Sequence, residues 1–188
     1  ARPPTVLVIF ALAACAWCLL PRGTPGKPAA AVLIVVPLLW SPPRPAPGEV
    51  FVTVLDLGQG LAVHVQTARH DLLFDAGPSY GEVADAGERV VVPYLRALGV
   101  RALDRLVLSH DDLDHVGGAD SVRAALPVRA VLGSLPTQHR FMTASGIAAQ
   151  SCIAGLAWEW DEVRFEVLHP ANASAASAAD GDDNRASC

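Results

Sequence analysis

Two histidines and three aspartates are concentrated in six consecutive residues, His110-Asp111-Asp112-Leu113-Asp114-His115. The apolar run Leu106–Leu108 just before them is typical of a buried strand, so the ionisable residues follow the carboxyl end of that strand. Packed together, these groups would repel one another and lose solvation unless a cation gathered them. Imidazole and carboxylate are ligands of divalent first-row metals. We therefore predict a metal site here, with ligands His110, Asp112, Asp114 and His115.

The simpler alternative is a solvated acidic loop. Asp114 or Asp120 could cap a helix over Ala119–Leu126 without binding any metal. Two histidines and two aspartates at strand-end spacing favour the metal site. The pair Gly117-Gly118 would then let the backbone pass close to a bound group.

The spacing His110-x-Asp112-x-Asp114-His115 resembles the second motif of the metallo-β-lactamase fold, whose usual form is His-x-His-x-Asp-His. Asp112 stands where that family normally has its second histidine. A carboxylate oxygen is a harder ligand than imidazole, which favours manganese, or a mixed zinc and manganese pair, over zinc alone.

A further carboxylate, that of Asp75, follows the short apolar run Leu72–Phe74. Asp75 could be an ordinary turn residue. Its position also resembles the first motif of the metallo-β-lactamase fold, which implies that it braces the metal loop. Asp56 and Gln59, in Asp56-Leu57-Gly58-Gln59-Gly60, could belong to a tight turn or to a loop of the site, and both interpretations stay open.

Charge divides the chain of 188 residues into two parts. All nineteen acidic residues lie from Glu49 onward, whereas four of the fourteen basic residues precede it, so the net charge changes from +4 to −9. The first part holds two apolar runs, Thr5–Leu20 and Ala29–Trp40. We expect one or two short transmembrane helices over 1–40, although a signal peptide is the alternative for the first run. Arg22 and Lys27 between the runs would place that loop in the cytoplasm and the later domain outside.

The proline-rich segment 41–49 is expected to be an extended linker before a domain over 50–188. Alternation and β-branched content predict five strands, over Val50–Leu55, Leu61–Gln66, Leu72–Phe74, Leu103–Leu108 and Val128–Leu132. Two helices are predicted, over Val90–Leu98 and Ala119–Leu126. Leu156–Trp160 and Val163–Leu168 should form a hairpin with Trp158 and Trp160 on opposite faces, and Asn172–Asp183 should be a loop.

Four motifs together resemble the carboxyl-terminal domain of the DNA-internalisation competence protein ComEC family. They are Val54-Leu55-Asp56-Leu57-Gly58-Gln59-Gly60, Leu72-Leu73-Phe74-Asp75-Ala76-Gly77-Pro78, the run from Val91 to Val100, and the run from Leu106 to Gly118. The resemblance implies an α/β fold, the metallo-β-lactamase-like αββα sandwich. Domains of this fold complete their metal site with a later aspartate and histidine, so we expect the chain to hold the N-terminal half of the domain and to be inactive alone.

The same resemblance implies an inner-membrane DNA-uptake channel for natural transformation. Its hydrolase domain would face outward and cleave phosphodiester bonds of the non-imported strand. Two divalent ions, manganese or zinc, would be bound, with Asp114 as the catalytic residue that orients or deprotonates water. Expected partners are DNA, the membrane, other competence proteins and the rest of the channel. The alternatives are a non-catalytic domain that guides DNA at the channel mouth, another hydrolase of this fold, and a free-standing soluble hydrolase.

Four cysteines are present, of which Cys15 and Cys18 lie in the first apolar run. Cys152 and Cys188 flank the predicted hairpin and the loop after it. In an oxidising compartment they could form a disulfide, and in the cytoplasm they would be two free thiols. The sequence gives no distance between them, so both states stay open.

Overall fold

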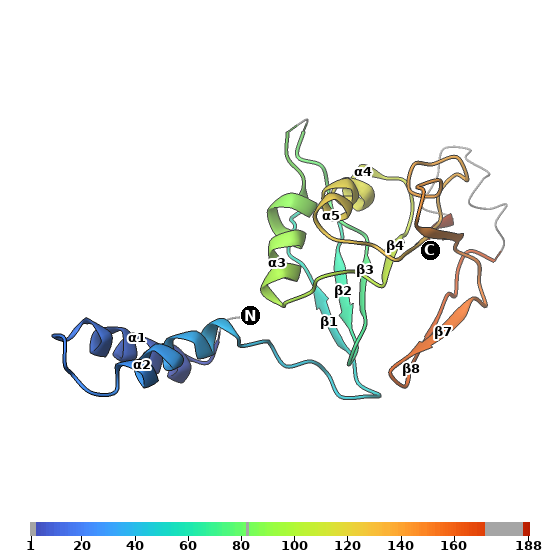
Figure 1. Cartoon of the computed structure of the whole chain (residues 1–188). Helices are drawn as coiled ribbons and strands as arrows, with labels where there is room; N and C mark the ends of the chain where they lie inside the picture. Colours follow the sequence, from blue (N-terminus) through green and yellow to red (C-terminus); the bar gives the residue numbers. More distant parts are fainter. Residues whose placement is uncertain (1–2, 82, 172–185) are drawn as a thin grey trace. The chain divides into compact units, whose positions relative to one another are not determined.

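The computed structural model of the chain describes residues 3–81, 83–171 and 186–188, so the loop expected over 172–183 lies outside the described residues. The chain divides into two compact units, with the division between Pro43 and Arg44. Each unit is described by itself (Figure 1).

The first unit is a pair of apolar helices, α1 (Thr5–Leu19) and α2 (Lys27–Val35), followed by a 3-10 helix, η1 (Val36–Leu38). The indole Nε1 of Trp17 donates a hydrogen bond to Pro25 O in the turn that joins them, at 3.0 Å. With a rise of about 1.5 Å per residue, α1 is roughly 22 Å long, shorter than the roughly 30 Å of a bilayer core. None of the helices in the described ranges combines the length and apolarity needed to cross a membrane.

The second unit is built on a six-stranded sheet in the order β1-β2-β3-β4-β5-β6. Its strands are β1 (Phe51–Val54), β2 (Val63–Gln66), β3 (Asp71–Phe74), β4 (Arg105–Leu108), β5 (Ala130–Gly133) and β6 (Ala148–Ser151). The first three are antiparallel, and β3 to β6 pair in parallel. The five strands predicted for the main sheet are present as β1 to β5, and β6 is an additional strand that the sequence did not predict.

Helices cover one face of this sheet, as Figure 1 shows. A π-helical turn, η2 (Gly87–Val91), leads into α3 (Val92–Ala97), and α4 (Leu113–Val116) and α5 (Ala119–Ala125) follow β4. On the helix-covered face, Tyr94 of α3 meets the ring of His64 on β2 at 5.6 Å between centroids. Leu73, Leu106 and Leu108 are fully buried.

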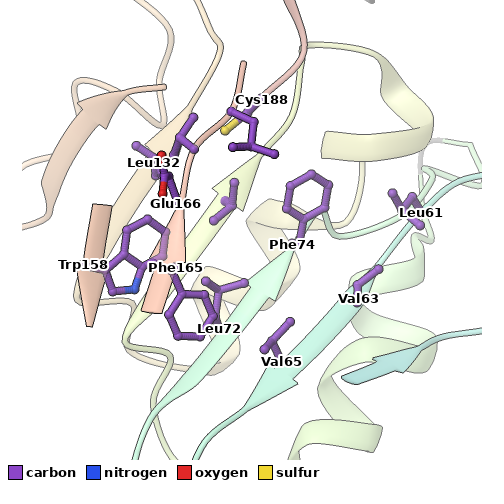
Figure 2. Close-up of a pocket in the computed structure, with 13 residues that line it drawn as sticks. Leu61, Val63, Val65, Leu72, Phe74, Leu132, Trp158, Phe165, Glu166 and Cys188 are labelled. Atoms are coloured by element: carbon purple, nitrogen blue, oxygen red, sulfur yellow. The ribbon is translucent and has the colours of Figure 1, made fainter. Parts of the chain in front are cut away.

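The opposite face packs against a second, two-stranded sheet of β7 (Ala157–Trp160) and β8 (Val163–Glu166). Leu72, Val107 and Leu132 of the main sheet form one apolar cluster with Val167 just after β8. A groove of about 410 Å³ lies between the two sheets and is lined by apolar side chains, as Figure 2 shows. The described residues therefore supply a helical layer and two sheets, which agrees with the α/β metallo-β-lactamase-like fold expected from the sequence.

Trp158 and Trp160 share one face of β7, so the expectation that they point to opposite faces was wrong. Residues two apart on a strand project to the same side. Their rings lie 5.8 Å apart, and the guanidinium of Arg105 lies over both, 4.0 Å from the Trp158 ring and 5.5 Å from the Trp160 ring. Arg105 thus packs between the sheets.

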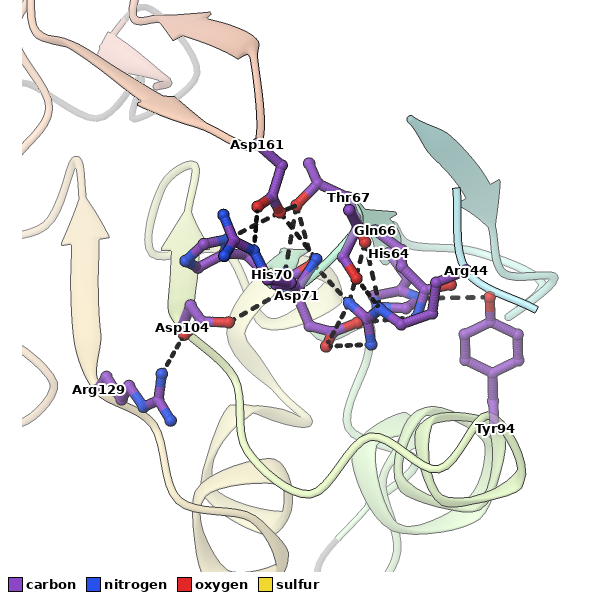
Figure 3. Close-up of polar contacts among 12 residues, drawn as sticks. Arg44, His64, Gln66, Thr67, His70, Asp71, Tyr94, Asp104, Arg129 and Asp161 are labelled. Carbon is purple, nitrogen blue, oxygen red and sulfur yellow. Dashed lines mark hydrogen bonds and ion pairs between the residues drawn. The ribbon is translucent and has the colours of Figure 1, made fainter. Parts of the chain in front are cut away.

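A buried carboxylate, that of Asp71, ties the linker to the start of β3 (Figure 3). The guanidinium of Arg44 donates to Asp71 Oδ2 from both Nη1 and Nη2 at 3.0 Å. His64 Nε2 and Gln66 Nε2 each lie 3.0 Å from Asp71 Oδ1. Burial opposes ionisation of Asp71 most strongly, but the hydrogen bonds from His64, Arg44 and Gln66 outweigh it and lower the pKa of the carboxyl.

The turn of the β7–β8 hairpin is fixed to the β2–β3 turn by Asp161 (Figure 3). Its carboxylate accepts hydrogen bonds from Thr67 Oγ1 at 2.7 Å and from the Arg69 backbone and side chain at 2.8 Å. The ring of His70 contacts the same carboxylate and stacks on Trp160 with centroids 4.9 Å apart. The hydrogen bond from Thr67, followed by those from His70 and Arg69, lowers the pKa of Asp161.

A disulfide joins Cys152, just after β6, to Cys188, with the two Cα atoms 5.6 Å apart. The Cys152 N–H donates to Gly133 O of β5 at 3.0 Å. Cys15 and Cys18 are free thiols in the first unit.

Asp71→Asn is expected to lower the free energy of unfolding by about 3 kcal/mol, because it leaves Arg44 without its buried partner. The folded pKa of Asp71 lies below the ordinary value of 3.8. Its contribution is therefore complete above that pH and is lost as the pH falls through the folded pKa. Urea unfolding at pH 7 and near pH 3 measures both effects.

Asp120→Asn is the matched control, since Asp120 pairs with Arg140 at the surface with more than half of both side chains exposed. It should change stability by less than about 0.5 kcal/mol. An Asp71→Asn chain as stable as the control would refute the role of the buried pair.

Thiol titration of the unfolded, unreduced chain should find two reactive cysteines, and four after reduction, because Cys152 and Cys188 are paired. The bridge closes a loop with a sequence separation of 36, and such a loop stabilises the fold by about 3 to 4 kcal/mol on the chain-entropy model. Four reactive thiols before reduction, in protein made in an oxidising compartment, would contradict the pairing.

Candidate metal centre

The candidate site forms where two parallel strands end side by side. Phe74 of β3 is level with Val107 of β4 in the register of the sheet. Asp75 directly follows β3, and Ser109 and His110 directly follow β4. The Asp75 N–H donates to Val107 O at 2.8 Å, which continues the ladder to the first residue of the site. The carboxyl ends of parallel strands thus bring together residues that are 34 or more positions apart.

Asp75 is fully buried and has a φ of 56°, in the left-handed region that few residues other than glycine adopt. Ser109 donates to it twice, from its N–H to Oδ1 at 2.8 Å and from its hydroxyl to Oδ2 at 2.7 Å. His115 Nδ1 lies 2.7 Å from Oδ2. Burial raises the pKa of the Asp75 carboxyl, and the hydrogen bonds from Ser109 and His115 oppose that rise. Strained backbone over a satisfied buried carboxylate is typical of functional sites.

These hydrogen bonds assign the protons of both imidazoles. His115 Nδ1 faces the carboxylate of Asp75 and therefore carries a proton. The single hydroxyl proton of Ser109 also goes to Asp75, so Ser109 Oγ can only accept from His110 Nδ1, at 2.9 Å. Both rings are consequently held with Nδ1 protonated, which leaves the Nε2 lone pairs free as metal ligands.

The four predicted ligands lie together as two pairs. His110 Nε2 is 3.1 Å from Asp112 Oδ2, and His115 Nε2 is 3.8 Å from Asp114 Oδ2. The two imidazole centroids are 4.1 Å apart. His110 is almost completely buried, whereas the carboxylates of Asp112 and Asp114 are exposed by 44% and 40%. The site therefore opens to solvent on its carboxylate side.

The donor chemistry of these pairs fits a divalent cation. In the closer pair a neutral His110 would turn its Nε2 lone pair toward the Asp112 carboxylate at 3.1 Å, an arrangement that a cation between them would stabilise, and His115 Nε2 faces Asp114 in the same way at 3.8 Å. Within the described ranges, no three His, Cys, Asp or Glu side chains are close enough to hold one ion. The residues supply ligands of the right type, but they do not form a closed coordination sphere.

Of the two loop residues left open by the sequence, Gln59 lies near the site. It lines a surface pocket of about 420 Å³ together with Pro78, Ser79, Tyr80, Leu113 and Asp114. The loop contacts the metal-binding segment directly, because the Leu61 N–H donates to Asp114 O at 3.2 Å. Within the described part of the chain, the carboxylate of Asp56 accepts a hydrogen bond from Gly58 N, at 3.4 Å, as in an ordinary turn.

Gly117 and Gly118 allow the chain to approach its own backbone. A Cβ on Gly118 would collide with Ala76 O and with the backbone of Gly87, and a Cβ on Gly117 would collide with Ser79 N. The pair thus has a packing role, because Gly118 lies against Gly87 at the start of η2 and Gly117 lies against Ser79. That it also lets the backbone pass close to a bound group stays a prediction.

Ser109 and Ser187 are the residues of this site that sequence reasoning missed. Ser109 joins Asp75 to His110, as described above, and the hydroxyl of Ser187 lies 3.3 Å from His110 Nδ1. A serine before a histidine is too common to attract notice. His64 and His70 belong to the networks of Asp71 and Asp161, and His169 Nδ1 lies 2.9 Å from Ser187 O.

Comparison with known proteins found relatives that include a competence protein and a recombination protein. Competence protein ComA of Neisseria gonorrhoeae is 38% identical over the whole chain, which covers 24% of that protein. Uncharacterized protein YcaI of Escherichia coli is 31% identical over 92% of the chain and 20% of its own length. Recombination protein 2 of Haemophilus influenzae is 35% identical over 64% of the chain and 14% of its own length. The chain thus spans a quarter or less of these relatives, and the resemblance to the ComEC family is confirmed.

The sequence profile of the Metallo-beta-lactamase superfamily matches residues 55–171. That range contains the loop of Gln59, the bend at Asp75 and the predicted ligands from His110 to His115, on the strand ends where the site forms. The chain therefore belongs to the metallo-beta-lactamase superfamily.

Proposed function

We propose that this chain is the metal-dependent hydrolase domain of a protein that takes up DNA for natural transformation. Its reaction would be the hydrolysis of phosphodiester bonds in the strand that is not imported. Relatives named as competence and recombination proteins, together with membership of the metallo-beta-lactamase superfamily, support the competence role. Phosphodiester cleavage is the more specific part of the proposal.

The orientation of the two imidazoles carries the proposal. A buried carboxylate and a serine are used to fix the tautomers of His110 and His115. In a solvated acidic loop the side chains would form hydrogen bonds with water, and nothing would hold them in this one arrangement. Nε2 atoms turned toward carboxylates are what a metal-dependent hydrolase requires.

Membership of the superfamily implies a divalent metal, and we propose two ions, manganese or zinc, held by His110, Asp112, Asp114 and His115. Bound metal would polarise the phosphoryl oxygen, activate water and stabilise the leaving oxygen. Asp114 is the proposed catalytic residue. Its half-exposed carboxylate lines the surface pocket with Gln59, where it can orient a water molecule and take its proton.

The charge of the second unit is consistent with a site that depends on metal for DNA contact. From Glu49 onward the net charge is −9, and strong phosphate binding by the protein surface would need clustered Lys and Arg. Bound cations would supply positive charge where the strand is cut. We place the protein at the inner membrane with this domain outward, where the Cys152–Cys188 disulfide persists, and with the membrane, other competence proteins and the rest of the channel as partners.

Asp75→Asn is expected to weaken divalent metal binding about 10- to 100-fold, as loss of a group that orients metal-binding histidines does. Manganese or zinc titration followed by calorimetry measures the effect. Glu159→Gln, which removes an exposed carboxylate on the hairpin, is the matched control. Equal affinities in the two variants would show that Asp75 does not brace the site.

His110→Ala should abolish metal-dependent cleavage of DNA by the full-length natural protein that carries this chain, because it removes a ligand. The assay compares strand cleavage with manganese, with zinc and after chelation, and Asp120→Asn is the control. Cleavage that survives in His110→Ala would overturn the catalytic assignment. Normal metal binding without DNA cleavage in the unmodified protein would favour another hydrolase of this fold or a domain that guides DNA.

A further inference from the structure

The segment Ala186–Cys188 contacts the metal-binding loop. The Cys188 N–H donates to Ser109 O at 2.8 Å, and the Ser187 hydroxyl lies 3.3 Å from His110 Nδ1. These contacts join residues that are 77 or more positions apart. They reach His110 on the side of the ring that is remote from its proposed metal-binding atom.

The proton positions on Ser109 and His110 determine which role the Ser187 hydroxyl can take. His110 Nδ1 carries a proton because Ser109, 2.9 Å away, donates its own proton to Asp75. Ser109 Oγ also lies 3.3 Å from His115 Nδ1, so its lone pairs are shared between two imidazoles. Ser187 offers His110 a second acceptor that no other described group claims. Ser187 therefore shares the Nδ1 proton that Ser109 has already placed, and this second contact holds the ring with its Nε2 lone pair toward Asp112.

Hydrogen bonds and the disulfide together hold Ser187 in place. Besides the contacts with Ser109 and His110, the Ser134 hydroxyl donates to Ala186 O and His169 Nδ1 lies 2.9 Å from Ser187 O. The Cys152–Cys188 bond is the covalent link, and it joins the segment to the end of β6, whose neighbour β5 pairs with β4. Since β4 leads directly to His110, the disulfide connects both ends of the Ser187–His110 contact to the same sheet.

We propose that Ser187 is a positioning residue for His110 and that the Cys152–Cys188 disulfide holds it in place, so that metal affinity depends on the redox state of the chain. A dithiol would supply two electrons and two protons, break the S–S bond, leave two thiols and become a disulfide itself. The segment would then be free to leave His110. The inference rests on the proposed metal site, and it adds a residue and a covalent bond that the ligand set does not include.

The first test uses variants that keep the disulfide. Ser187→Ala should weaken manganese or zinc binding about 10-fold, the lower end of the effect of losing an orienting partner. Ser187→Thr, which keeps a hydroxyl, should restore most of the affinity. Ser121→Ala is the control, because that hydroxyl bonds to Asp85 instead. Affinity unchanged in Ser187→Ala would overturn the role of Ser187.

A second measurement needs no metal. Proton NMR of the His110 ring should show slow exchange of the Nδ1 proton with water in the oxidised chain and faster exchange in Ser187→Ala, because Ser109 still sets the tautomer but one of the two acceptors is lost. Faster exchange in a chain that binds no metal would support the positioning role and refute the proposed function. Metal binding with an unchanged exchange rate would do the reverse, so the two failures are distinguishable.

The third test addresses the disulfide. Reduction with a dithiol should lower the affinity of the chain about 10-fold, to that of Cys152→Ser/Cys188→Ser, and should not affect the double variant further. Near-ultraviolet circular dichroism establishes that the reduced chain is folded at the temperature used. A folded, reduced chain that binds metal as tightly as the oxidised chain would refute the tether.

Discussion

The buried carboxylate of Asp75 is the constraint on which the candidate site depends. A carboxylate without exposure to water must find donors inside the protein, and the cost of leaving it unpaired is several kcal/mol. Its donors are Ser109 and His115, which lie on either side of His110 in the metal-binding loop. The loop therefore takes its shape from the need to satisfy one charge, and both imidazoles receive their orientation as a consequence.

A second buried carboxylate organises the opposite end of the same strand. Asp71 begins β3, and its partners come from the linker at Arg44 and from β2. Asp161 continues this arrangement by joining the hairpin to the β2–β3 turn. The carboxylates of Asp71 and Asp161 at this end are buried and paired, whereas the end at Asp75 leaves Asp112 and Asp114 open to solvent. The Asp71 end of the strand therefore stabilises the fold, whereas the Asp75 end leaves carboxylates accessible for a reaction.

Much of the fold and the residue types of the site follow from local pattern. Strand alternation gave β1 to β5 and the hairpin within a few residues, and the ionisable cluster was placed correctly at the end of β4. The strand β6 was missed because Ala148–Ser151 contains no β-branched or aromatic residue. The bonds of Ser109, Ser187 and Arg44 were missed because each joins residues far apart in sequence, and a single serine or linker arginine carries no pattern. Whether the four ligands share metal ions stays a prediction.

The carboxylates at the two ends of β3 also limit how this strand can pair. Asp71 and Asp75 are four positions apart, one at each end of the short run Leu72–Phe74. A slip by one residue would turn the apolar side chains to the wrong faces. A slip by two would keep the faces but remove Asp71 from Arg44 and Asp75 from Ser109, leaving two charges buried without partners. Misregistered forms of the sheet are thus penalised at both ends of the central strand, which favours a single pairing while the chain folds.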